Sequence, residues 1–258
     1  MLTTFKNLDT INDEKNATIE LMIPPYYKEY YFKKYNRRFN SIYYNSFNEK
    51  SNPKGFRGFV QHLQTNYFIA GNLPLEYLEI IKEKYPFLIS KEEGFTYSVS
   101  CFSKEKVQSS REPQPLFSKK LDVSNANNKL DTAIEYSQAF TFQLNDIVYS
   151  RHSIINLSAR LFVPDSSSNP ILVMEILENG KSLKWNGSEY FSYNNQPKTA
   201  NTIFLSTSLT AFNLKEHPNA EVKIYIWNRD KKEAMIQDMN MEVVKANPFI
   251  YALYEPID

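Results

Sequence analysis

The sequence predicts an α+β protein in which a small α/β domain precedes an all-β sandwich of the jelly-roll type. In the first half, segments with helical spacing of apolar residues alternate with short strand-like segments. In the second half, short alternating segments follow one another between turn residues, with hardly any helical periodicity. The stretch between them is rich in Ser, Asn, Pro and charged residues, which is typical of a linker. We therefore expect a domain at 1–105, a linker at 106–132 and a β-sandwich at 133–258.

Strands and helices alternate along the first half, as a small α/β domain requires. The clearest helix runs from Asn72 to Tyr85, because its leucines and isoleucines recur at helical spacing and Pro86 ends the pattern. Its glutamates lie near the start and its lysines near the end, which suits the helix dipole. The other expected elements are a strand at Thr18–Ile23, a helix at Pro25–Tyr35, a helix at Gly58–Gln64, and strands at Asn66–Ala70 and Phe95–Phe102.

The strands of the second half show the alternation of a sheet with one apolar face. In Ile154–Phe162, residues such as Ile155 and Leu157 fall on one face, while Asn156 and Ser158 fall on the other. Asn, Asp and Gly residues stand between the strands, where turns need them. The remaining expected strands are Gln138–Leu144, Ile171–Glu178, Ser188–Tyr193, Thr202–Thr210, Val222–Asn228 and Ala234–Lys245, and strands at such spacing favour a sandwich or jelly roll.

Composition and motifs disfavour several function classes. The 30 basic and 29 acidic residues leave a formal charge of +1, which lacks the basic excess of nucleic-acid binders and polybasic membrane-surface proteins. With 6 glycines and no glycine-rich phosphate loop, nucleotide binding is disfavoured too. The single cysteine, Cys101, excludes an internal disulfide, and its place within a strand favours a buried structural thiol. The three histidines lie far apart and lack metal-ligand spacing.

The sequence shows neither a secretory signal nor a run of about 18 apolar residues that would span a membrane. Two readings follow from this. The chain is a cytoplasmic protein, or it is the soluble part of a membrane protein whose anchoring segments precede Met1.

Aromatic and polar residues near the expected loops of the second half are candidates for sugar binding. Sugar rings present apolar C–H faces that pack on flat aromatic rings, while amides and charged groups hydrogen-bond their hydroxyls. For each of these residues, packing in the core or at its rim is the alternative, and Trp227 is assigned to the core. The candidate ligand-binding residues are Tyr149, Arg151, His152, Trp185, Asn186, Tyr190 and Tyr193.

The last two strands, Val222–Asn228 and Ala234–Val244, resemble the closing hairpin of jelly-roll carbohydrate-binding modules. This resemblance implies a glycan partner and an acidic residue that helps to hold a structural calcium. Asp238 stands where that residue is expected, although Gln237 departs from the commoner acidic pair. A calcium ion takes several oxygen ligands, so Asp131 and Glu135 would have to complete the site. The alternative is a solvated Asp238 with no metal, and no other cofactor is expected.

Residues Phe59–Ser103 are similar to a piece of bacterial polytopic membrane glycosyltransferases of the polyprenol-phosphate-sugar type. Three short motifs carry the similarity: Asn66-Tyr67-Phe68-Ile69, Tyr85-Pro86 and Phe102-Ser103-Lys104. The resemblance implies a soluble extracytoplasmic domain that follows membrane helices lying outside this chain. The catalytic residues of that family lie between those helices, so none is carried over.

Three hypotheses follow for function. The first is a non-catalytic extracytoplasmic region of a larger membrane protein that binds a glycan or a protein partner. The second is a glycoside hydrolase or lyase whose two carboxylates meet between the domains. The third is a structural assembly domain with no small ligand.

Overall fold

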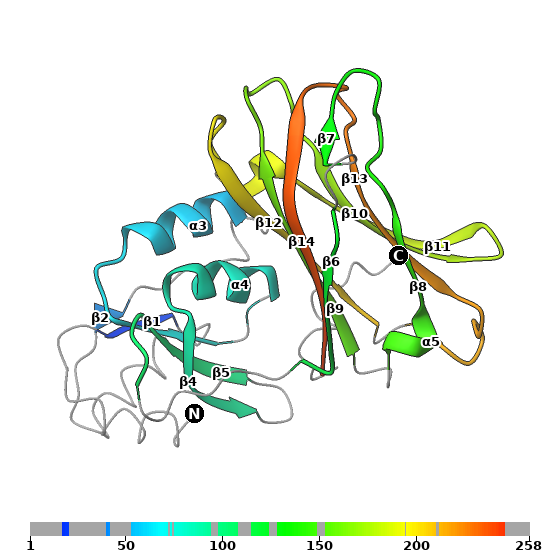
Figure 1. Cartoon of the computed structure of the whole chain (residues 1–258). Helices are drawn as coiled ribbons and strands as arrows, with labels where there is room; N and C mark the ends of the chain where they lie inside the picture. The colour runs from blue at the N-terminus through cyan, green and yellow to red at the C-terminus, as the bar shows by residue number, and fades with distance from the viewer. Residues whose placement is uncertain are drawn as a thin grey trace. The chain divides into compact units, whose positions relative to one another are not determined.

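The chain forms two compact units, 1–113 and 114–258, and each is described here by itself (Figure 1). The computed structural model describes residues 17–20, 40–41, 53–71, 73, 75–93, 98–107, 115–123, 128–148, 153–193, 195–209 and 212–245. The helix expected at Pro25–Tyr35 lies outside these residues. No helix among them is both long enough and apolar enough to cross a membrane.

The first unit is built on a mixed sheet with the strand order β2-β1-β3-β5-β4. Strand β1 runs parallel to β2 and β3, while β5 runs antiparallel to β3 and β4, which confirms a small α/β unit. The strands are β1 (Ala17–Glu20), β2 (Asn40–Ser41), β3 (Tyr67–Ala70), β4 (Phe87–Glu93) and β5 (Ser98–Ser103), and the helices are α3 (Pro53–His62) and α4 (Leu75–Lys84).

Helices α3 and α4 are joined by an aromatic contact and an ion pair. The rings of Phe56 and Tyr77 lie 4.6 Å apart between centroids. The Arg57 Nε donates to Glu83 Oε2 at 2.8 Å, and the two side chains form a salt bridge. In β5, burial raises the pKa of the Cys101 thiol to about 12, which keeps it protonated and unreactive. This is the structural thiol that the sequence favours.

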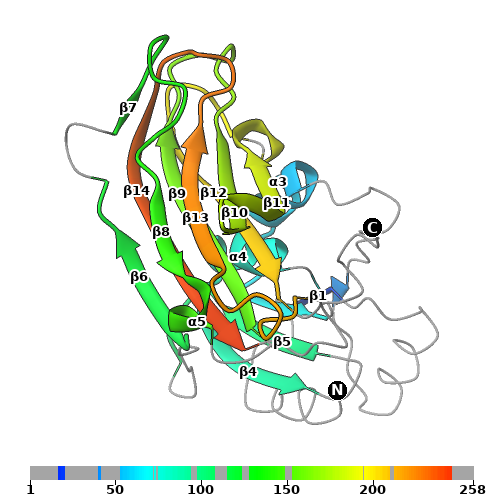
Figure 2. The same ribbon diagram turned by 90° about the vertical axis from the view of Figure 1, so that its right-hand side faces the viewer.

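The second unit consists of two antiparallel sheets (Figure 2). The β10 sheet has the order β11-β10-β13-β8, and the β9 sheet has the order β12-β9-β14-β6, with β7 also paired to β14. The strands are β6 (Phe117–Leu121), β7 (Lys129–Leu130), β8 (Phe140–Gln143), β9 (Ser153–Phe162), β10 (Ile171–Glu178), β11 (Lys181–Glu189), β12 (Ala200–Ser208), β13 (Glu221–Trp227) and β14 (Ala234–Lys245), and the helix α5 (Leu144–Ile147) follows β8.

The strand pairing of this unit is that of a jelly roll. Four pairs are nested along the chain, with β6·β14 outermost, then β8·β13, then β9·β12, and β10·β11 innermost. Such nesting arises when one long antiparallel hairpin folds over into two facing sheets. The expected fold class is therefore confirmed.

The core of the second unit lies between the two sheets. On β9, Ile155, Leu157 and the other alternate residues are buried, as their spacing predicts. On β13, Val222, Ile224 and Ile226 are buried in the same way. Because side chains alternate along a strand, the odd-numbered residues of β13 project from the outward face of the β10 sheet.

Residues 106–132, expected as a linker, contain two strands of the β9 sheet. Strand β6 pairs with Met239–Val243 of β14, and β7 pairs with its start. In β6 the residues between Phe117 and Leu121 are Ser-Lys-Lys and are exposed. This edge strand therefore has the composition of a linker, which is why the sequence predicted a linker here. Similarly, the expected strand Ser188–Tyr193 is the end of β11 followed by a 3₁₀ helix at Tyr190–Tyr193.

Replacing Leu121 tests whether this segment belongs to the sandwich. Leu121 is 1% exposed and lies opposite Met239, so Leu121→Ala is expected to lower the free energy of unfolding by about 2–4 kcal/mol. Both tryptophans lie in the second unit, so urea unfolding followed by tryptophan fluorescence reports on this unit. The exposed Lys120→Ala is the control, and equal midpoints for the two variants would contradict the assignment.

Candidate functional site

Aromatic side chains gather on the outward face of the β10 sheet. Trp185 on β11 lies opposite Glu175 of β10, and Tyr225 and Trp227 of β13 lie opposite Val173 and Ile171 of β10. Residues opposite one another share a face of the sheet, so all three rings project away from the core. Tyr136, bridged to Trp227, extends the row. We call Tyr136, Trp185, Tyr225 and Trp227 the aromatic face.

The tip of the Trp185 indole lies over Gly187 of its own strand. A Cβ atom added at Gly187 would come within 2.5 Å of Trp185 Cη2 and within 3.0 Å of Ile171 Cγ2, so the indole occupies the space above that glycine. Hydrogen bonding from the Trp185 side chain also lowers the pKa of the Tyr225 hydroxyl. Even so, Trp185 is 48% exposed. Part of the indole is therefore packed on the sheet, and about half of the side chain is open to solvent.

Tyr136 and the two aromatic residues of β13 form the other end of the aromatic face. The Tyr136 ring lies 6.3 Å from the Trp227 ring with an interplanar angle of 12°, and 5.7 Å from the Tyr225 ring at 72°. Tyr136 is 52% exposed. Beneath the aromatic face, Ile171 and Val173 are buried although they point away from the core. The rings thus cover the apolar centre of the sheet as well as presenting a surface.

The Tyr225 hydroxyl is a neutral hydrogen-bonding group within the aromatic face. Burial raises the pKa of Tyr225, the bond from Trp185 lowers it, and the charge of Glu175 raises it. The net shift is upward, so the phenol is protonated at neutral pH. It can therefore both donate and accept hydrogen bonds.

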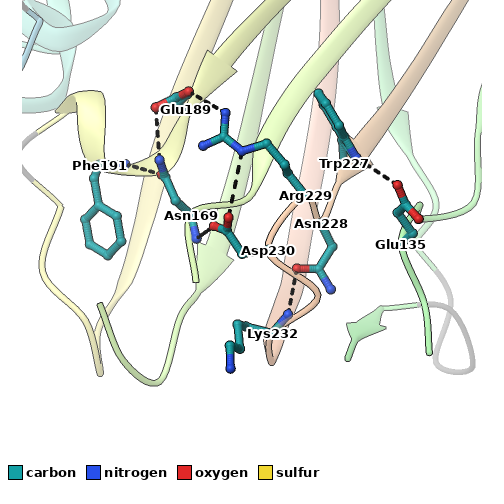
Figure 3. Close-up of polar contacts among 9 residues, drawn as sticks. All are labelled: Glu135, Asn169, Glu189, Phe191, Trp227, Asn228, Arg229, Asp230 and Lys232. Carbon is teal, nitrogen blue, oxygen red and sulfur yellow. Dashed lines mark hydrogen bonds and ion pairs between the residues drawn. The ribbon is translucent and has the colours of Figure 1, made fainter. Parts of the chain in front are cut away.

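An ordered polar network borders the aromatic face at the Trp227 end (Figure 3). The Trp227 Nε1 donates to Glu135 Oε1 at 3.4 Å, and Glu135 Oε2 lies 3.1 Å from Lys231 Nζ. The hydrogen bond from Lys231 is the main cause that lowers the pKa of Glu135. Glu135 is therefore a carboxylate at neutral pH, held beside the indole.

A second part of this network joins the loop before β10 to the turn after β13 (Figure 3). Arg229 Nη1 lies 3.2 Å from Glu189 Oε1, and Asn169 Nδ2 donates to Glu189 Oε2 at 2.9 Å. The Asn169 backbone N–H donates to Asp230 Oδ2 at 2.9 Å, and its side-chain oxygen accepts from the Phe191 N–H at 3.0 Å. These contacts fix the polar border against the sheet.

The structure separates the residues that the sequence groups as ligand-binding. Trp185 lies on the aromatic face, but Asn186 points to the opposite side of β11 and donates to Thr207 Oγ1 at 2.5 Å. Tyr190 and Tyr193 are buried, and their hydroxyls donate to backbone carbonyls, Tyr193 to Phe204 O at 2.6 Å. These two tyrosines anchor the 3₁₀ helix in the core and present no ring face to a ligand. The other predicted residues, Tyr149, Arg151 and His152, lie outside the described residues.

Three members of the aromatic face, Tyr136, Tyr225 and Trp227, are absent from the sequence prediction. The assignment of Trp227 to the core is wrong, because Val222, Ile224 and Ile226 point inward and Trp227 has the opposite parity. Strict counting along β13 would have placed Trp227 beside Tyr225 on the outward face. Tyr136 precedes its strand and carries no such pattern.

The three carboxylates expected to bind calcium do not come together. Asp131 accepts hydrogen bonds from the backbone N–H groups of Ala133 and Ile134, and Glu135 is paired with Lys231. Asp238 lies on β14 opposite Arg160. Within the part of the chain that the structure describes, no group of three or more His, Cys, Asp and Glu side chains could hold a metal ion.

Tyr193 offers a test of its place in the core. Tyr193→Phe removes the buried hydrogen bond to Phe204 O, and we expect it to lower the free energy of unfolding by about 1 kcal/mol. Urea unfolding followed by tryptophan fluorescence measures this, with the exposed Ser118→Ala as the control. An unchanged midpoint for Tyr193→Phe would show that its hydroxyl is not held as described.

Gly187 offers a test of the position of Trp185 over this glycine. Because a methyl group at this position would lie 2.5 Å from the indole, Gly187→Ala is expected to lift the ring from the sheet. In a Trp227→Phe background Trp185 is the only tryptophan, and quenching of its emission by acrylamide should increase. Ser182→Ala, exposed on the same strand, should leave the quenching unchanged. Identical quenching in both variants would mean that the indole does not rest on Gly187.

Comparison with known proteins adds distant likenesses only. No family model and no curated protein matches the chain. The N-terminal CBM22-1-CBM22-2 tandem domain of Xyn10C from Paenibacillus barcinonensis is similar at 10% identity over 57% of this chain and 55% of that one, with a TM-score of 0.34. This chain thus spans little more than half the length of that structure. The xylan-binding module CBM15 is similar at 10% identity over 50% of this chain and 98% of that one, with a TM-score of 0.31.

A CBM4 structure is also similar, at 11% identity over 76% of this chain and 90% of that one, with a TM-score of 0.25. Scores this low carry no argument about the present chain. Its fold therefore rests on its own strand order, and its function has to be argued from the aromatic face.

Proposed function

We propose that the second unit binds an extended glycan chain along the aromatic face. The observation that carries this is Trp185, an indole that rests on Gly187 of the outward sheet face while about half of the side chain is exposed to solvent. A flat, half-exposed ring fixed in this way matches the apolar C–H face of a sugar, and it loses little entropy on binding because it is already held.

The layout of the rings favours a chain over a single sugar. Trp185 and Tyr136 are three strand positions apart across the sheet and four residues apart along it, a span of about 20 Å at ordinary strand spacings. Tyr225 lies between them. This span is several times the length of one sugar ring. Successive rings of a short oligosaccharide can therefore each contact an aromatic side chain.

The polar border supplies hydrogen bonds to hydroxyl groups. Glu135 and Glu189 are ordered acceptors, and the Tyr225 hydroxyl is a neutral donor and acceptor. Both carboxylates are already engaged with cations, so their role in the proposal is recognition and not chemistry at the glycosidic bond. Binding without catalysis is the function that this arrangement supports best.

The cellular setting stays a prediction from sequence. An extracytoplasmic location, as part of a larger membrane glycosyltransferase-like protein, rests on the resemblance of Phe59–Ser103. We include the extracytoplasmic location in the proposal, and fractionation of cells that express the native gene tests it.

Binding is tested by isothermal titration with hexasaccharides of β-1,4-linked glucose, xylose and mannose. We expect saturable binding to at least one of them. In Trp185→Ala the affinity should be about tenfold or more weaker, because removal of a stacked ring costs on the order of 1.4 kcal/mol of binding free energy. Affinity should also fall as the oligosaccharide is shortened to a disaccharide. Leu116→Ala removes a comparably exposed apolar side chain outside the aromatic face and is the matched control.

Two results would overturn the proposal. One is the absence of binding to all of these chains, and to a wider glycan array, at millimolar protein concentration. The other is binding that Trp185→Ala leaves intact while circular dichroism shows that the variant is folded.

A further inference from the structure

We infer that the glycan is uncharged and that Glu175 enforces this preference; the inference rests on the proposed function and concerns the same face. Glu175 occupies the centre of the sheet between Trp185 on β11 and Lys223 on β13. A glycan lying across Trp185 therefore passes over or beside this carboxylate.

Glu175 acts on the aromatic face as a negative charge. It belongs to the outward row of the sheet, and its charge raises the pKa of the nearby Tyr225 phenol. The Glu175 carboxylate would repel a uronate, sulfate or phosphate group placed on the rings, because like charges in a desolvated contact repel. Its negative charge therefore weakens the binding of an anionic ligand.

Two of the cations around the aromatic face are already paired with carboxylates. Arg229 is paired with Glu189 at 3.2 Å, and Lys231 with Glu135 at 3.1 Å. Lys223 lies opposite Glu175, and its Nζ sits 5.5 Å from the centre of the Tyr225 ring. An anionic ligand would have to displace an existing partner before it gained Arg229 or Lys231, and it would meet Lys223 beside the negative charge of Glu175.

The acidic side chains outnumber the basic ones here. In the described part of the chain, Glu221 on β13 accepts from Gln143 on the same outward face, and Asp230 lies 3.8 Å from Arg229 in the turn that follows. With Glu135, Glu175 and Glu189 they make five carboxylates, against the four cations Lys223, Arg229, Lys231 and Lys232, which leaves the surface negative. Carboxylates also accept hydrogen bonds from neutral hydroxyls, so the surface that repels an anionic chain suits a neutral one.

The experiment compares each neutral glucose or mannose hexasaccharide with the same chain oxidised at C6. For xylose it compares a hexasaccharide bearing a glucuronate branch with the same chain after reduction of the branch carboxyl group, so that the size of the two ligands is matched and the charge differs. The neutral chain is expected to bind about tenfold or more tightly at low ionic strength. The difference should shrink when salt is raised from about 20 to about 500 mM, since salt screens exposed charges.

Variants assign the effect to Glu175. Glu175→Gln keeps the size of the side chain and one acceptor but removes the charge, so the preference for the neutral chain over the anionic chain should fall to less than about twofold. The matched control is Glu233→Gln, at an exposed carboxylate paired with Lys129 outside the aromatic face. It should change neither affinity.

The outcomes separate this inference from the proposed function. Equal or tighter binding of the anionic chain would overturn the inference and leave glycan binding standing. A charge preference that survives in Glu175→Gln would overturn the role of Glu175. Failure of both neutral and anionic chains to bind would overturn the proposed function itself.

Discussion

The register that holds β11, β10 and β13 side by side is the constraint on which the second unit depends. It sends Val222, Ile224 and Ile226 into the core and sends Tyr225 and Trp227 outward. A slip of one residue would exchange these two sets, which buries polar groups and exposes the core. The register therefore fixes the interior of the sandwich and the composition of its outer surface in the same step.

The outer surface in turn depends on Gly187, which has no side chain. Trp185 reaches across the sheet toward Tyr225 only because position 187 has no Cβ atom to hold the indole away. The rings then cover Ile171 and Val173, so the same contacts stabilise the sheet and shape its surface. Trp185 therefore both stabilises the sheet and presents the ring that we propose binds the ligand.

How far the sequence predicts this structure depends on how strongly each segment is patterned. The alternating strands β9 and β13 and the helix α4 are found near their expected places, because burial on one face leaves a clear period. Strand β10 is found near its expected place as a short apolar run between turn residues. The edge strand β6 was expected as linker because its exposed Ser-Lys-Lys centre hides the pattern. Of the predicted ligand-binding residues that the structure describes, Trp185 lies on the aromatic face. Tyr190 and Tyr193 were expected near a loop. They are buried because they lie in a 3₁₀ helix, and no periodic pattern of apolar residues in the sequence predicts that helix.

The nesting of the jelly roll also decides how the second unit responds to tension in the chain. Phe117 at the start of β6 lies opposite Val243 near the end of β14, so the first and last described strands of this unit meet at these two points. A force pulling these points apart would load the β6·β14 hydrogen bonds one after another, as in a zipper, and not all together in shear. Under such a force the β6·β14 pair is therefore expected to separate first. The aromatic face belongs to the β10 sheet and to the pairs nested inside β6·β14.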